Sequence, residues 1–164
     1  MKSILLSCLI ILFLTTNVMA ARSSAKSPAV ANDVKLYNEG VRLMLAKQFA
    51  KAEKQFRESL SINERFAEAH NNLAYTLRKQ GVQHFEEALA HYNRAIELSP
   101  DLPEPYMYRG VLHVQMGNRS LALKDHKMLL PLKPTLAKEL ENVIAEGREK
   151  EPEQFFGVSK EISP

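Results

Sequence analysis

Residues 67–102 read AEAHNNLAYTLRKQGVQHFEEALAHYNRAIELSPDL, and they contain the clearest helical pattern in the chain. Gly81 separates two predicted amphipathic helices, and Pro100 ends the unit. A lone helical hairpin of this size cannot bury two apolar stripes, so the stretch needs neighbours of the same kind. The stripes recur at helical spacing and consist of Leu73, Ala74 and Leu77, then Ala88, Tyr92, Ala95 and Ile96.

The same hairpin pattern occurs before and after this stretch. The small residues of the first helix are spaced by 34 and then 36 residues, and those of the second helix by 36 and then 34. The two extra residues therefore lie in the VQHF turn at residues 82–85 of the middle unit. The matched small residues are Gly40, Ala74 and Gly110, then Ala52, Ala88 and Ala122, and the large residues four positions later are Phe56, Tyr92 and His126.

This period resembles that of the tetratricopeptide repeat (TPR) family over roughly two thirds of the chain. Small residues let two helix backbones approach, and the large residue fills the space beside the contact. The resemblance implies an all-α fold, an α-solenoid of three TPR helix–turn–helix units plus a C-terminal capping helix. The predicted domain at 33–147 comprises repeats at 33–66, 67–102 and 103–136 and a cap helix at 136–147.

The cap helix is predicted from its own periodicity. Charged residues fall away from its apolar face, and Gly147 is a natural stop. A solenoid needs such a last helix, with a polar back, to cover its exposed end. The apolar face consists of Leu136, Leu140, Val143 and Ile144.

The first 20 residues, MKSILLSCLIILFLTTNVMA, are typical of a secretory signal peptide. Lys2 is followed by an apolar run that is shorter than the roughly 20 residues needed to span a bilayer. We expect cleavage after Ala20, no stable membrane insertion afterwards, and a periplasmic or secreted protein, most simply a bacterial one. A retained anchor and a lipoprotein modified at Cys8 are the alternatives. Residues 21–32 predict a flexible lead, and Asp33 is the predicted N-cap of the first helix that follows it.

Residues 148–164 predict a charged tail with one unusual feature, the pair Phe155-Phe156. Exposed paired aromatic rings are costly in water, which favours packing back onto the cap helix. A short linear motif for another protein is the alternative interpretation.

Composition excludes several function classes. A formal net charge of +3 over 164 residues gives no electrostatic case for nucleic-acid binding. The single cysteine, Cys8, lies in the predicted signal, so the mature chain has no thiol chemistry. The sequence contains no GxSxG, glycine-rich phosphate loop or HExxH motif. We therefore expect no enzyme activity, no cofactor and no metal.

His113 and His126 are the strongest candidates for a metal- or pH-responsive pair, because they occupy large-residue positions on the two helices of one hairpin. Two ligands make a weak metal site, and such rings more often fill space. Arg109 and Asp125 fall on the same two helices, where they predict a structural ion pair.

The resemblance also implies where a ligand binds. In TPR proteins the first helices of the hairpins line a concave groove. Relatives that hold a C-terminal carboxylate place Lys and Arg there. Here the matching positions are Tyr37, Val41, Glu104 and Tyr108, and only Asn72 fits that pattern. The groove candidates are Tyr37, Val41, Met44, Asn71, Tyr75, Arg78, Met107, Val111 and Val114.

Together these features predict a protein- or peptide-binding module that acts as an adaptor or assembly factor outside the cytoplasm. Its expected ligand is an extended or helical segment with apolar anchors. One alternative is a homo-oligomeric structural component of an envelope complex. A second is the metal- or pH-responsive binder that uses the two histidines.

Overall fold

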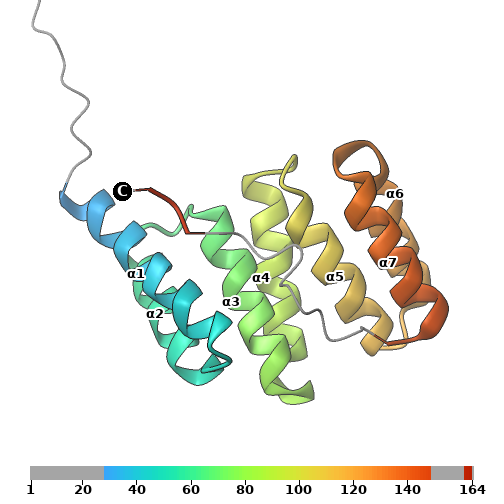
Figure 1. The fold of residues 1–164 in the computed structure, drawn as a ribbon, viewed down its shortest axis with the longest axis horizontal. Helices are drawn as coiled ribbons and strands as arrows, with labels where there is room; N and C mark the ends of the chain where they lie inside the picture. The colour runs from blue at the N-terminus through green and yellow to red at the C-terminus, as the bar shows by residue number, and fades with distance from the viewer. Residues whose placement is uncertain (1–27, 149–160, 164) are drawn as a thin grey trace, which may run out of the picture.

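The computed structural model describes residues 28–148 and 161–163, and within these ranges it contains seven α-helices and one short 3₁₀ turn (Figure 1). The predicted signal peptide and the Phe155-Phe156 pair lie outside these ranges. The elements are α1 (Pro28–Leu45), α2 (Phe49–Ile62), α3 (Ala67–Gln80), η1 (Val82–His84), α4 (Phe85–Leu98), α5 (Pro103–Gln115), α6 (Arg119–Leu132) and α7 (Pro134–Glu146).

The helices form three successive hairpins and a capping helix, as the sequence predicts. α1 packs on α2, α3 on α4 and α5 on α6, and each hairpin contacts the next. α7 packs on both α5 and α6. In Figure 1 the helices α1, α3, α5 and α7 lie side by side, with α2, α4 and α6 on the other side of the molecule. We call the surface formed by the first three of these helices the α1–α3–α5 face.

Two glycines lie where helices approach closely. A Cβ atom at Gly40 would lie 2.6 Å from Cε1 of Phe56 on α2, so only glycine fits against this fully buried ring. A Cβ atom at Gly110 would lie 2.5 Å from Cδ2 of Leu140, which belongs to α7. The small residue of the third repeat thus receives the cap helix.

The first helix begins earlier than predicted, at Pro28 instead of after Asp33. Proline is tolerated in a first turn, where its missing N–H has no helical partner, so Pro28 is compatible with the start of the helix. Asp33 is consequently not an N-cap but a buried helical residue. Its Oδ2 accepts a hydrogen bond from Nδ2 of Asn63 (2.9 Å), and its carbonyl accepts one from the Ser59 hydroxyl (2.9 Å). These bonds tie α1 to α2 and to the residue that follows it.

Each turn inside a hairpin contains one residue with a positive φ angle. Gly81 and Gly117 have φ angles of 125° and 77°, and Lys47 occupies the corresponding turn of the first repeat with φ 57°. The extra residues of the middle repeat form η1, so the predicted lengthened turn is a short 3₁₀ turn. Pro131 lies inside α6, which continues to Leu132, and Pro134 begins α7. The amide that Pro131 lacks would bond to a carbonyl in the last, exposed turns of that helix.

The cap helix has the predicted amphipathic pattern. Its buried residues include all four predicted apolar positions, and Gly147 ends it in the left-handed conformation. α7 therefore covers the end of the solenoid with an apolar face.

Residues 161–163 lie beside α1, at the end of the molecule opposite α7 (Figure 1).

In the part of the chain that the structure describes, none of the helices is long and apolar enough to cross a membrane.

Candidate peptide-binding face

The nine predicted groove residues all lie on α1, α3 and α5, but the structure does not leave them open to solvent. All except the half-buried Val114 are buried within the chain. On α1, the ring of Tyr37 packs against Phe66 and Phe56, with centroids 4.8 and 5.9 Å apart. These first-helix side chains therefore pack within the solenoid, and their role in binding a ligand stays a prediction.

A row of polar groups runs along the buried side of α1 and α3. Nδ2 of Asn72 donates to the hydroxyl of Tyr37 (3.1 Å), and Nδ2 of Asn71 donates to Oδ1 of Asn72 (3.1 Å). Oδ1 of Asn71 is buried and accepts no hydrogen bond from the described residues. A buried carbonyl without a partner is costly, so this acceptor is suited to a donor that the described chain does not supply.

Aromatic and cationic side chains join α3 to α5. The rings of Tyr75 and Tyr108 meet edge to face with centroids 5.0 Å apart. The guanidinium carbon of Arg78 lies 5.3 Å from the first ring centroid and 5.4 Å from the second. Nη1 of Arg78 also donates to Oε1 of Gln115 (3.2 Å). Two predicted groove residues, Tyr75 and Arg78, therefore form one cluster with a tyrosine from the next hairpin.

Glu104 contributes a second acceptor at the first turn of α5. Its Oε2 is buried and has no hydrogen-bond partner in the described ranges. Burial raises the pKa of this carboxyl, and the negative charge of Glu68 raises it further. The positive charge of Lys133 acts in the opposite direction and lowers the pKa.

The predicted ion pair of the third hairpin is confirmed. Arg109 donates to both carboxylate oxygens of Asp125, from Nε at 3.1 Å and from Nη2 at 2.5 Å, and Asp125 is almost fully buried. Arg109 also donates to Oδ1 of Asn93 on α4 (2.7 Å), which links two hairpins. The pair is part of the architecture, as predicted.

Of the two histidines predicted to lie near each other, His113 has a charged neighbour from the partner helix. Nε2 of His113 lies 4.0 Å from Oδ2 of Asp125, and no hydrogen bond joins the two histidines within the described residues. Burial lowers the pKa of His113. Among the described side chains, no group of three or more potential ligands gathers to hold a metal ion.

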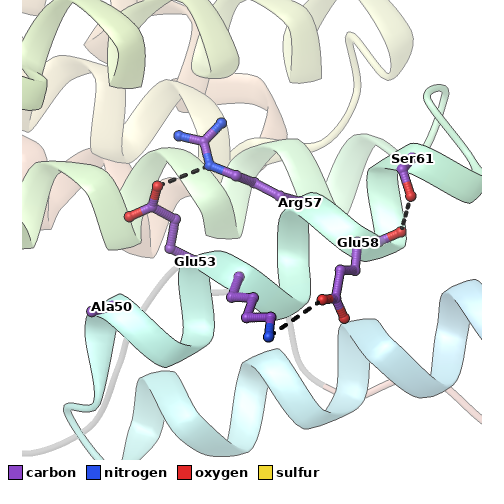
Figure 2. Close-up of a pocket in the computed structure, with 6 residues that line it drawn as sticks. Ala50, Glu53, Arg57, Glu58 and Ser61 are labelled. Carbon is purple, nitrogen blue, oxygen red and sulfur yellow. Dashed lines mark hydrogen bonds and ion pairs between the residues drawn. The ribbon is translucent and has the colours of Figure 1, made fainter.

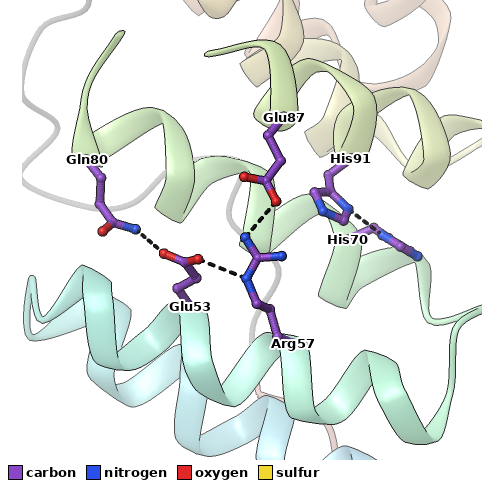
Figure 3. Close-up of polar contacts among 6 residues, drawn as sticks. All are labelled: Glu53, Arg57, His70, Gln80, Glu87 and His91. Atoms are coloured by element: carbon purple, nitrogen blue, oxygen red, sulfur yellow. Dashed lines mark hydrogen bonds and ion pairs between the residues drawn. The ribbon is translucent and has the colours of Figure 1, made fainter. Parts of the chain in front are cut away.

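A different pair of histidines meets in the middle hairpin (Figure 3). Nδ1 of His70 lies 2.9 Å from Nδ1 of His91, and Nε2 of His70 lies 3.0 Å from the carbonyl oxygen of Glu64. The carbonyl only accepts, so His70 carries its proton on Nε2 and its Nδ1 accepts the proton of His91. Burial lowers both pKa values, and that of His91 falls to about 4. Sequence spacing along one helix could not reveal this pair, because its members lie on two helices.

The side of the molecule away from the face carries charged contacts between the first two repeats. Figure 3 shows Arg57 between Glu53 (2.8 Å) and Glu87 (2.6 Å), while Gln80 donates to the other oxygen of Glu53 (2.7 Å). A shallow hollow lies over α2 beside these groups (Figure 2). Its lining comes from one helix, and its charges pair with one another, so it offers a ligand no enclosed contacts. The hollow is lined by Ala50, Glu53, Lys54, Arg57, Glu58 and Ser61.

Comparison with known proteins agrees with this architecture. A family model described as TPR repeat matches residues 83–117. Tetratricopeptide repeat protein 6 from Homo sapiens is 32% identical over 84 residues, which are 51% of this chain and 16% of that protein. The chain thus spans less than a fifth of the length of that relative.

Two solved structures resemble the fold over most of their own length. The Arabidopsis OM64 TPR domain has a TM-score of 0.67 at 20% identity, covering 73% of this chain and 99% of that one. The first TPR of Spaghetti (RPAP3), bound to the HSP90 peptide SRMEEVD, has a TM-score of 0.65 at 18% identity, covering 71% and 93%. The fold is therefore an all-α, TPR-like solenoid, and the family-model match supports the TPR family for its repeats.

Proposed function

We propose that this chain is a non-enzymatic adaptor whose α1–α3–α5 face binds an extended segment of another protein. The observation that carries the proposal is the buried Oδ1 of Asn71, an acceptor that no described residue satisfies. A main-chain N–H of an extended segment supplies the missing donor. A protein of similar fold has been solved with a peptide bound, which supports this class of function.

The chemistry of the face favours a ligand with apolar anchors over one with an acidic end. Glu104 and Glu68 disfavour a carboxylate at the start of α5, and Asn72 is engaged with Tyr37. The polarizable side chain of Met107 and the Tyr75–Tyr108 pair suit aliphatic or aromatic side chains.

The adaptor is proposed to act outside the cytoplasm. This part of the proposal depends on residues 1–20, whose charged start, apolar run and small final residue are typical of a cleaved export signal. Mass spectrometry of the chain purified from its source organism tests it. A mature chain that begins at Ala21 supports export, and an intact Met1 in the cytoplasmic fraction contradicts it.

Peptide selection with the full chain tests the binding function. Displayed random peptides are selected on the natural chain, and the binding site of the best peptide is mapped by amide chemical shifts. We expect shifts at Asn71, Val114 and their neighbours on the same face. Shifts confined to α2, α4 and α6 would contradict the proposal. The variant Asn71→Leu should weaken binding, and Asn118→Leu, at an exposed turn, should leave it unchanged.

A further inference from the structure

Residues 161–163 contact α1 through a two-point hydrogen bond. Nδ2 of Asn38 donates to the carbonyl oxygen of Ile162 (2.7 Å), and the amide N–H of Ile162 donates to Oδ1 of Asn38 (2.8 Å). One asparagine side chain therefore satisfies both main-chain groups of one residue, as a neighbouring strand would. The two residues are 124 positions apart in the chain.

Two side-chain contacts accompany this pairing. Ile162 is half-buried and packs against the apolar core, and Oε1 of Glu161 lies 3.4 Å from Nε of Arg42. Asn38 and Arg42 are four residues apart and thus lie on the same side of α1. Since Glu161 meets the later helical residue and Ile162 the earlier one, the segment runs antiparallel to α1.

We infer that residues 161–163 are an intramolecular ligand that occupies the α1 end of the α1–α3–α5 face. The amide of Asn38 reads only main-chain groups, so it accepts any extended segment. The apolar site under Ile162 and the charge of Arg42 then favour an aliphatic residue preceded by an acidic one. This inference rests on the proposed function, because occupancy regulates binding only if the same face receives a partner.

The intramolecular contact lowers the apparent affinity for a partner. A partner segment gains access to Asn38 only in the fraction of molecules in which residues 161–163 have left α1. The Arg42–Glu161 contact contributes little to holding the segment, because both side chains are half exposed and Arg42 also pairs with Glu39 at 2.8 Å. The main-chain bonds and Ile162 are the principal contacts.

Hydrogen exchange of the Ile162 amide in the full chain tests the docking without any partner. A net contribution of about 1 kcal/mol per hydrogen bond corresponds to at least about fivefold slower exchange than in an unstructured peptide of the same sequence. Asn38→Ala should return the rate to that of the peptide. The matched variant Asn118→Ala should leave the protection intact, and unchanged exchange in α5 shows that both variants fold.

Exchange of Ile162 at the unstructured rate in the natural chain would overturn the inference. Protection that disappears on dilution would also overturn it, because the occupant would then be residues 161–163 of a second copy.

A second experiment connects the docking to the proposed function. The variant Ile162→Asp loses the apolar contact and should bind a selected peptide at least about fivefold more tightly than the natural chain. Leu130→Asp, which changes an exposed leucine on α6, should not alter the affinity. Equal affinity of Ile162→Asp and the natural chain would contradict the regulatory role. If no peptide binds either chain, the proposed function fails, while the exchange of Ile162 still decides the docking.

Discussion

Position 40 accepts only glycine, since the Phe56 ring leaves no room for a Cβ atom. Gly40→Ala is therefore expected to destabilise the chain by about 1–3 kcal/mol, the usual cost of overpacking. Urea denaturation measures this change. Phe56→Leu replaces the ring by a smaller side chain and should relieve the clash. The double variant Gly40→Ala with Phe56→Leu should therefore be more stable than the sum of the two single changes predicts. Simple additivity would contradict the proposed contact.

For the buried Arg109–Asp125 pair, we expect removal of one partner to cost more stability than replacement of both. Arg109→Ala leaves a buried carboxylate without its partner and should cost about 3–5 kcal/mol in thermal or urea unfolding. Replacing both members, by Arg109→Met with Asp125→Leu, should cost less than that single change. The control Arg94→Ala, which breaks an exposed pair with Glu97, should cost no more than about 1 kcal/mol. Equal costs for Arg109→Ala and Arg94→Ala would show that Asp125 does not depend on its partner.

The His70–His91 pair predicts a loss of stability in acid. Both pKa values are lower in the folded chain than the unfolded value of about 6.5, so unfolding takes up protons below that pH. The stabilising effect of the neutral pair is complete above pH 6.5 and falls as the pH decreases toward the His91 pKa of about 4. Urea midpoints measured across this interval should decrease. His91→Gln keeps a donor for His70 without titrating, so its midpoint should decrease less. An identical decrease would assign the pH dependence to other groups.

At the scale of the elements, the turn of the first repeat contains a residue in a conformation that favours glycine. Lys47 has φ 57°, whereas the other two repeats have Gly81 and Gly117 at the corresponding position. Lys47→Gly should stabilise the chain by about 0.5–1 kcal/mol, because relief of the left-handed strain exceeds the extra chain entropy of glycine. Lys51→Gly, inside α2, should destabilise it by a similar amount. A destabilised Lys47→Gly variant would show that the turn is not strained.

The elements themselves could be predicted from the sequence because each hairpin repeats the same spacing. Three units, the lengthened middle turn and the cap helix all follow from small residues, glycines and apolar periodicity. The start of α1 could not be predicted, because proline is compatible with both a break and a first turn. Its first turns are instead fixed by contacts of Asp33 with residues about 30 positions away.

For the candidate site, the sequence predicts which helices carry the residues but not how deeply each side chain is buried. The repeat pattern places the groove candidates on α1, α3 and α5, but burial depends on which side chains neighbouring hairpins cover. The docking of Ile162 on Asn38 joins residues with no shared periodicity, so nothing in the sequence indicates it. The same holds for the two histidines that meet across α3 and α4.

At the scale of the whole molecule, the solenoid has one end covered by α7 and a face that contacts residues from the far end of the chain. Stability in such a structure is close to a sum over neighbouring hairpins, so changes at α1 should leave the α5–α7 end folded. This independence makes α1 suitable for probing binding without loss of the fold.

Site-specific photo-crosslinking shows whether the α1–α3–α5 face binds a segment of another protein. A photoreactive residue replaces Arg42 on α1 in one full-length chain and the exposed Leu130 on α6 in another, each with and without Ile162→Asp. After illumination in an extract of the source organism, the crosslinked peptides are sequenced by mass spectrometry. We predict that position 42 captures residues near Ile162 of the same chain and, in the Ile162→Asp variant, an extended segment of another protein. Capture of a partner at position 130, with none at position 42, would contradict binding on the α1–α3–α5 face.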